Sequence, residues 1–162
     1  SEAMRIAHKQ VYQVFSFAKK YVPGFENSYL EKIGSILGIR ESRRVEGLYL
    51  FKGEDVTNKS KFPDGVIRAC YGIDVHKKKQ VIDQNEKNYV PSYEDFYEIP
   101  LRSMISREIK NLAVVGRGFS SDFLGQSAAR IIPTCVDMGE VVGKLTAKTN
   151  KDFHEILFKN FY

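Results

Sequence analysis

The stretch from residue 111 to residue 147 constrains the fold of this chain more than any other. It begins with the apolar run 112–115 (Leu-Ala-Val-Val), which is too short for a helix and has the β-branched content of a buried strand. A glycine turn follows at residues 116–118, and a Pro-Thr pair at 133–134 precedes a run of helical spacing over about 135–149. A strand that leads through a glycine turn to a helix presents free backbone N–H groups. Such groups suit an anionic or polar ligand.

Patterns along the rest of the chain predict an α+β fold related to the α/β class. Helical spacing or helix-start signals mark a helix at the amino end that stops at residues 22–24, and further helices near 28–37, 54–57, 135–149 and 151–162. Strand composition marks segments near 45–51, 66–76, 97–105 and 112–116. The polar residues 77–95 indicate a long loop. We therefore expect a mixed β-sheet with flanking helices.

The composition agrees with one folded globular piece and excludes several classes. The chain has 162 residues, of which 43% are hydrophobic and 28% are charged. Cys70 and Cys135 lie far apart, which argues against a disulfide framework and for a reducing compartment. His8, His76 and His154 are scattered without a second ligand type at metal-binding spacing, so we expect no metal site.

The charge and hydropathy patterns argue against a membrane or nucleic-acid role. No apolar run approaches the roughly 20 residues that a membrane-spanning helix needs, so we expect no membrane association and a cytoplasmic location. The net charge is +5, but the tight basic cluster is limited to residues 77–79, and Lys9, Lys19 and Lys20 fall on the polar face of a helix. We interpret this charge as solvated surface and expect no nucleic-acid partner.

An arginine-rich segment precedes the first expected strand. Arg40, Arg43 and Arg44 lie within five residues, and a guanidinium group matches a carboxylate with two parallel hydrogen bonds. These arginines are therefore candidates for binding a carboxylate substrate. A structural network with Glu41 and neighbouring acids is the alternative, and the residues alone leave both open.

Ordered motifs across most of the chain resemble a known family. In the organising stretch they are Gly116-Arg117, Ser120, Arg130, Pro133-Thr134-Cys135 and Met138-Gly139. Upstream they are the segments 23–27 (Pro-Gly-Phe-Glu-Asn), 38–44 (Gly-Ile-Arg-Glu-Ser-Arg-Arg), 47–49 (Gly-Leu-Tyr), 74–76 (Asp-Val-His) and 97–103 (Tyr-Glu-Ile-Pro-Leu-Arg-Ser). The chain thus resembles the carboxy-terminal portion of FAD-dependent oxidoreductases whose flavoprotein fold is related to fumarate reductase and succinate dehydrogenase.

The resemblance implies FAD as the cofactor and a set of residues that bind it. Gly116 and Arg117, with Ser120 in the same loop, would lie beside the flavin or its ribityl chain. The turn at Met138, Gly139 and Glu140 would bring helix N–H groups and their positive dipole end to the pyrimidine edge of the flavin. That arrangement would favour the reduced cofactor, which gains negative charge at this edge.

The resemblance also implies catalytic and substrate-binding residues. His76 lies where the family places a histidine on the substrate side of the flavin, and it would bind substrate or relay a proton. Arg130 resembles the arginine that anchors a substrate carboxylate. For each residue a plain alternative stays open: a surface or hydrogen-bonding histidine, and a helix-end arginine that bonds backbone carbonyls. Arg102 also matches a family arginine, and a solvated arginine at a strand edge is an equally good interpretation.

The sequence departs from the family in ways that bear on cofactor binding. The family's amino-terminal Gly-x-Gly-x-x-Gly turn, which holds the FAD pyrophosphate, has no counterpart near the start of this sequence. Asp122-Phe123-Leu124 stands where several relatives have a histidine, and Glu140 replaces a frequent glutamine. We expect the chain to be a carboxy-terminal portion, with residues 1–110 as a substrate-side subdomain and 111–162 as the end of an FAD-binding domain.

Two functions follow from these expectations. The first is part of an FAD-dependent oxidoreductase that transfers a hydride between flavin and a small organic substrate. The expected partner is then an amino-terminal FAD-binding segment or a second copy of the chain, because strand edges and apolar faces would otherwise be exposed. The second is a non-catalytic remnant or protein-binding module that has lost flavin. FAD binding by the chain alone is the observation that separates them.

Overall fold

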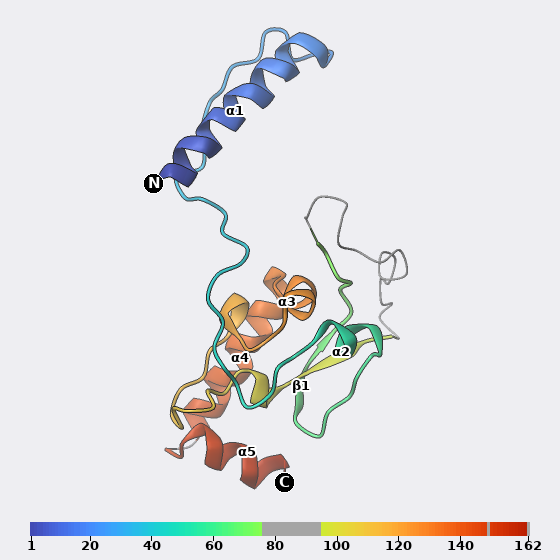
Figure 1. Ribbon diagram of the computed structural model, residues 1–162, viewed down its shortest axis with the longest axis vertical. Helices are drawn as coiled ribbons and strands as arrows, with labels where there is room; N and C mark the ends of the chain where they lie inside the picture. Colours follow the sequence, from blue (N-terminus) through green and yellow to red (C-terminus); the bar gives the residue numbers. More distant parts are fainter. Residues whose placement is uncertain (76–94, 149, 162) are drawn as a thin grey trace. The chain divides into compact units, whose positions relative to one another are not determined.

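The computed structural model describes residues 1–75, 95–148 and 150–161 (Figure 1). The chain divides into two compact units, Ser1–Ile39 and Arg40–Tyr162. The first unit is one long helix with the segment that follows it. The second unit holds the sheet, the other helices and the hydrophobic core.

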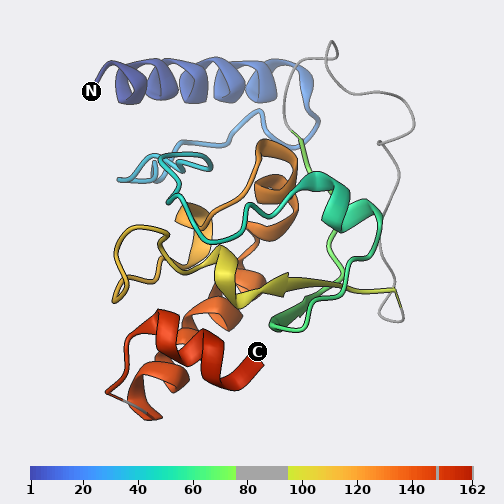
Figure 2. The ribbon, with the colours of Figure 1, turned by 60° about the horizontal axis from the view of Figure 1, so that its bottom comes forward.

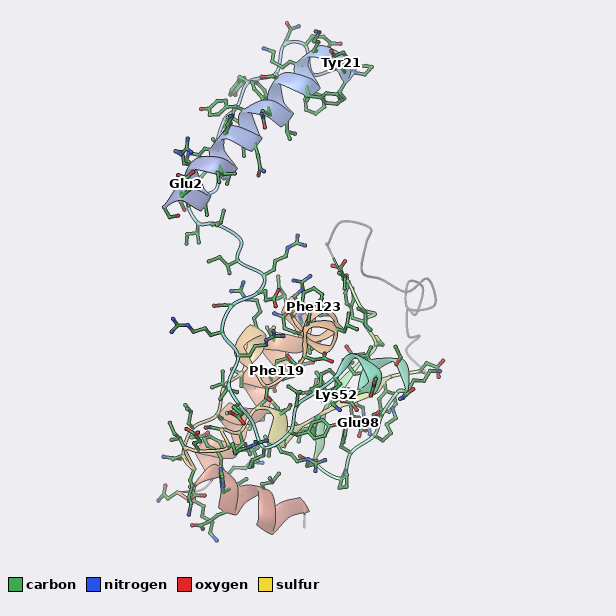
Figure 3. The ribbon with its side chains drawn as sticks, in the orientation of Figure 1. Glu2, Tyr21, Lys52, Glu98, Phe119 and Phe123 are labelled. Carbon is green, nitrogen blue, oxygen red and sulfur yellow. The ribbon has the colours of Figure 1, made fainter. Side chains whose placement is uncertain are left out.

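The first unit is built around helix α1 (Glu2–Tyr21), which confirms the predicted amino-terminal helix. The helix ends where the N–H of Val22 donates to the carbonyl of Ala18 at 2.9 Å. Its apolar side chains and two residues of the following segment, Phe25 and Leu30, line a groove of about 510 Å³. None of the residues of α1 is fully buried, and Figure 3 shows side chains projecting along the helix between Glu2 and Tyr21.

The prediction of a helix over residues 28–37 is wrong, because this segment has no regular secondary structure. An isolated helix of this length is marginal in water unless an apolar face packs against a partner. Here Tyr29 and Ile36 are 79% and 86% exposed, so the apolar residues of the segment gain little from burial. The residues that suggested a helix therefore lack the packing that would stabilise one.

The sheet of the second unit pairs two antiparallel strands, β1 (Gly65–Ala69) and β2 (Tyr97–Pro100), which can be followed in Figure 2. Ile67 faces Ile99 across the pair, and the register shifts between Gly65 and Ile67. The α+β class is thus confirmed. The expected mixed sheet is smaller than predicted, since the segments near 45–51 and 112–116 contribute isolated bridges in place of full strands.

Close packing accompanies one of the isolated bridges. Gly47 bridges Ser106, and a Cβ atom at Gly47 would lie 2.6 Å from the Cβ of Ser120. Only a residue without a side chain allows this approach. Phe51 bridges Ser121 in parallel orientation. N–H groups of residues 45–51 also donate to the carbonyls of Arg102, Ile105, Gly118 and Ser120, so the segment is bonded from two directions.

The second unit also contains helices. They are α2 (Gly53–Thr57), α3 (Phe123–Ala129), α4 (Ile132–Lys148) and α5 (Phe153–Phe161), with short 3-10 turns at Leu101–Ser103 (η2) and Gly116–Gly118 (η3). The helices predicted near 54, 135–149 and 151–162 are confirmed, with α4 starting earlier than expected. Within the described ranges, no helix is long and apolar enough to cross a membrane.

The hydrophobic core draws on the whole of the second unit. The ring of Phe51 lies 5.9 Å from the rings of both Tyr97 and Phe119, and all three side chains are fully buried. Met138 of α4 joins the same cluster, as does Leu157 of α5. The predicted boundary between residues 110 and 111 falls inside this unit, and the assignment of its two sides to substrate and FAD-binding parts stays a prediction.

One carboxylate joins two helices of this unit. Asp122 is the N-cap of α3, and its Oδ1 accepts a hydrogen bond from the N–H of Gly125 at 2.6 Å. The same carboxylate accepts from the N–H of Gly53, the first residue of α2, at 3.1 and 3.2 Å. Asp122 N donates in turn to the carbonyl of Phe51. A single side chain therefore satisfies unpaired N–H groups at the starts of α2 and α3.

Replacing Asp122 by alanine will lower the free energy of unfolding by about 1–2 kcal/mol or slightly more, because two helix starts lose an acceptor. Urea denaturation of the Asp122→Ala variant measures this change. Asp137→Ala, at an exposed acidic position inside α4, is the matched control and should stay within about 0.5 kcal/mol of the wild type. Equal stability of the two variants would contradict the double-cap role.

A second polar cluster lies beside β2 and α2. Asp64 is fully buried, and its Oδ1 lies 3.1 Å from Nε of Arg102 while its Oδ2 accepts from Arg102 N at 3.1 Å. The Arg102 guanidinium also lies over the ring of Tyr49 at 5.1 Å. The Tyr49 hydroxyl donates to the Asp55 carboxylate, whose oxygens are both 3.0 Å away. Burial first, and then the Asp55 hydrogen bond, raise the pKa of Tyr49 to about 12.

Because its pKa in the folded chain exceeds the ordinary value of 10.0, Tyr49 contributes stability that is complete below about pH 10 and is lost as the pH rises towards about 12. The Tyr49→Phe variant will therefore show a flatter decline of unfolding free energy over this alkaline window. Urea denaturation at about pH 8 and about pH 11 measures the difference. Tyr71→Phe, at an exposed tyrosine of the same unit, is the control, and identical slopes for the two variants would rule the effect out.

Candidate functional site

A cleft of about 1100 Å³ opens in the second unit, where η3, the end of α3 and the start of α4 meet. Three arginines border it, Arg40, Arg117 and Arg130. Its apolar wall is formed by Ile131, Ile132, Pro133 and Val136, and the remaining lining residues are Asp74, Gly116 and Cys135. Ligand pockets for drug-sized molecules commonly measure about 300–1,000 Å³, so this cleft has room for a large organic ligand.

The glycine turn brings Arg117 to the cleft. Gly116 has φ +67°, in the left-handed region that residues with a side chain rarely adopt, and it begins η3 directly after the apolar run. On the other side of the turn the N–H of Phe119 donates to the carbonyl of Gly116 at 3.3 Å. The side chain of Phe119, labelled in Figure 3, is fully buried in the core. The turn is thus fixed by the core on one side and opens onto the cleft on the other.

Helix α3 places Arg130. Arg130 is the C-cap of this helix, and its N–H donates to the carbonyl of Gln126 at 3.0 Å. Its guanidinium Nη2 donates to the backbone carbonyl of Asp74 at 2.9 Å. Arg130 is therefore a helix-end arginine that bonds a backbone carbonyl, as the alternative interpretation expects. The same arginine also lines the cleft.

The start of α4 forms another side of the cleft. The first hydrogen bond of the helix runs from Cys135 N to Ile131 O at 3.0 Å, so the N–H groups of Ile132 and Thr134 precede it. Pro133 occupies the first turn, where its missing N–H costs nothing. The positive end of the helix dipole therefore lies at the cleft, among the three arginines.

This position corrects the dipole expectation for Met138, Gly139 and Glu140. Because α4 begins at Ile132, these residues lie inside the helix, where N–H groups are bonded to preceding carbonyls. Met138 is fully buried in the core, and the exposed Glu140 pairs with Lys144. The helix-start N–H groups that the expectation invoked thus belong to residues 132–134. Direct contact of the three residues with flavin stays an untested prediction.

Cys135 is the nucleophilic group of the cleft. Its Sγ would lie 3.8 Å from a Cβ atom built on Gly116, which places the thiol against the glycine turn. Burial raises the pKa of the Cys135 thiol, and the positive charge of Arg117 partly opposes this shift. The thiol is consequently protonated at neutral pH, and it adds no negative charge to the site.

Charge and exposure together define what the cleft suits. The three guanidinium groups and the start of α4 attract negative charge. Beside them Ile132 is 80% exposed and Val136 is 59% exposed, which leaves an apolar surface one helical turn long. The arrangement suits a ligand that has both an anionic group and a flat or apolar part.

The cleft brings together four of the predicted site residues, Arg40, Gly116, Arg117 and Arg130. Arg43 is exposed and is not among the residues that line the cleft. Arg44 forms an ion pair with Glu41 at 3.3 Å, as the structural-network interpretation expects for this arginine. Ser120 is buried, and its N–H donates to the carbonyl of Ser103 at 2.8 Å.

Two further predicted residues lie away from the cleft or beyond the described chain. Arg102 has a structural partner in the buried Asp64, and it is not among the lining residues. It is therefore neither a solvated strand-edge arginine nor part of this site. His76 lies outside the described residues, so its predicted role is a proposal only.

The sequence analysis missed the apolar wall and the thiol as site residues. Ile132 and Val136 are spaced four apart on α4, a pattern that marks one helix face. Their exposure, however, depends on which face packs on the core, and that is decided by Met138 and its neighbours. The Pro-Thr-Cys motif contains Cys135. In the sequence analysis this motif supports only the family resemblance.

Comparison with known families identifies the class. A family model described as FAD dependent oxidoreductase matches residues 1–161. The chain therefore belongs to this family, whose cofactor is FAD and whose chemistry is that of flavin oxidoreductases. Comparison with curated proteins and with solved structures gave no match.

The cleft fits parts of the family's cofactor. The arginines and the start of α4 match the negative charge of FAD, and the exposed Ile132 and Val136 match a planar ring. Gly116 and Arg117 would hold the cofactor beside the thiol of Cys135, and Arg130 would face it from the end of α3.

We expect Cys135 to report on this cleft through its reactivity. With Cys70 changed to serine, Cys135 is the remaining thiol, and its raised pKa predicts slow reaction with a disulfide reagent near neutral pH that accelerates in alkali. Arg117→Ala will slow the reaction further at a given pH, because a charge that lowers the pKa is lost. The absorbance of the released thiolate measures both rates. Reaction faster than that of a free cysteine derivative at neutral pH would contradict this account.

Proposed function

We propose that this chain forms part of the flavin and substrate site of an oxidoreductase related to the fumarate reductase and succinate dehydrogenase flavoproteins. In this proposal it takes part in hydride transfer between FAD and a small organic substrate. The observation that carries the proposal is the convergence of Arg117, Arg130 and Arg40 with the start of α4 in one cleft. Family membership supplies the cofactor class.

The charged and the apolar residues of the cleft would have different roles in binding. When bound, FAD supplies the group that accepts or donates the hydride. Gly116 and Arg117 would hold and orient the cofactor, and the wall of Ile132 and Val136 would pack on its ring and exclude water. Arg130 would bind a substrate carboxylate through its guanidinium fork, with its orientation fixed by the Asp74 carbonyl.

Arg40 would contribute a second positive charge for the same anionic substrate. His76 is proposed, from the resemblance, to bind substrate or relay a proton. Met138, Gly139 and Ser120 are proposed, on the same ground, to support the cofactor from behind the cleft. A substrate-side role for residues 1–110 and a cofactor-side role for residues 111–162 belong to the same proposal.

The proposal includes a partner for the cofactor's pyrophosphate. In the family a Gly-x-Gly-x-x-Gly turn at a helix start holds this group. We propose that an amino-terminal FAD-binding segment or a second copy of the chain provides the corresponding surface. The cleft described above would then bind the flavin end of the cofactor.

Titration of the chain with FAD, followed by flavin fluorescence, tests the proposal. We expect saturable binding, and we expect Arg117→Ala and Arg130→Ala each to weaken it about tenfold, as for the loss of one charge-assisted hydrogen bond. Arg43→Ala removes an exposed arginine outside the cleft and is the matched control.

Two outcomes would count against this function. If the arginine variants and the control bind FAD equally well, the cofactor does not use the cleft. If no flavin binds at any concentration, alone or with the amino-terminal segment supplied, the chain is a non-catalytic remnant or a protein-binding module, which is the alternative left open by the sequence.

A further inference from the structure

A fully buried glutamine lies at the centre of α3, behind the cleft. Gln126 is 0% exposed, and its backbone N–H donates to the carbonyl of Asp122 at 3.0 Å. Its side chain is not part of the cleft lining, and the family resemblance assigns it no role. A buried amide normally finds partners for both its donor and its acceptor, so the bonds of this side chain are informative.

The amide donor of Gln126 is bonded to the backbone that carries Arg40. Gln126 Nε2 donates to the carbonyl of Arg40 at 2.9 Å, across 86 positions of sequence. The acceptor Oε1 is buried and has no hydrogen-bond partner within the part of the chain that the structure describes. Within the described residues, the hydrogen bond to the Arg40 carbonyl is thus the one that the Gln126 side chain makes.

Arg40 needs such an anchor. It lies in a segment without regular secondary structure, and its side chain is exposed and borders the cleft. A long side chain on an irregular segment has many orientations, and a ligand that uses it must first restrict them. A hydrogen bond from a buried side chain fixes the backbone from which the guanidinium extends.

One face of α3 carries Gln126 together with the helix cap and a cleft arginine. Asp122, Gln126 and Arg130 are spaced four residues apart, so they lie along one side of the helix. The first caps the helix, the second holds Arg40 and the third reaches the cleft itself. One helix face thus sets the positions of two of the three arginines.

We propose that Gln126 is a positioning residue, which fixes the Arg40 backbone so that the Arg40 guanidinium faces the anionic ligand of the cleft. This inference rests on the proposed function for the nature of that ligand. Gln126 does not touch the ligand in this account. Its effect on binding passes through Arg40, and that can be measured separately from the stability of the fold.

The Gln126→Met variant tests the role. Methionine has a similar length and volume, and it removes the donor to Arg40 together with the unpartnered buried oxygen, so the fold keeps its packing. We expect FAD to bind about fivefold more weakly, as for the loss of one ordinary hydrogen bond that acts through a charged group. Ser127→Ala is the matched control, because it removes a buried hydroxyl that donates to the carbonyl of Phe123 within the same helix.

A double-mutant cycle shows whether the effect passes through Arg40. If it does, Gln126→Met weakens FAD binding in the wild type but adds nothing in an Arg40→Ala background. A control variant that weakens binding as much as Gln126→Met, or effects of the two substitutions that simply add, would overturn the positioning role.

Limited proteolysis with trypsin gives a readout that needs no ligand. Loss of the anchor should raise the rate of cleavage after Arg40 several-fold in Gln126→Met, with mass spectrometry identifying the cut, and leave it unchanged in Ser127→Ala. An unchanged rate in Gln126→Met would overturn the inference. Failure of the wild-type chain to bind FAD would instead overturn the proposed function, so the two failures are distinguishable.

Discussion

The carboxylate of Asp122 is the interaction on which much of the second unit depends. It accepts hydrogen bonds from the starts of α2 and α3, and the backbone of the same residue is bonded to Phe51 in the core. Helix starts left without acceptors are costly when they are partly buried. By satisfying two of them at once, Asp122 fixes α3 relative to the core, and α3 in turn carries Arg130 to the cleft and Gln126 to the backbone of Arg40.

Backbone hydrogen bonds outside regular strands, in place of an extensive sheet, hold the segments around this helix. Gly47, Phe51 and Ile105 each form an isolated bridge, further backbone bonds join residues 45–51 to residues 102–120, and the two paired strands are short. Such an arrangement orders irregular segments next to a compact core, which is where binding residues are commonly found. The arginine segment and the glycine turn are both irregular, and both reach the cleft.

The sequence was sufficient to predict the elements that depend on residues close together in the chain. The amino-terminal helix and the glycine turn at Gly116 follow from spacing and from the absence of a side chain. It failed where the cause is a partner distant in sequence. Asp122 bonds a glycine 69 positions away, and the partner of Arg102 is 38 positions away, so neither role is visible in a local pattern. From the sequence, Pro133 indicates a break before the helix, although it occupies the first turn of α4.

The four-residue spacing along α3 has a consequence for how this region can change during evolution. Each residue of a helix turns the chain by about 100°, so an insertion or deletion between Asp122 and Arg130 would rotate the later residues off the shared face. The cap, the amide and the cleft arginine could then no longer act together. Substitutions on the opposite face of α3 leave this alignment intact. Sequence length within residues 122–130 should therefore vary less than residue identity does.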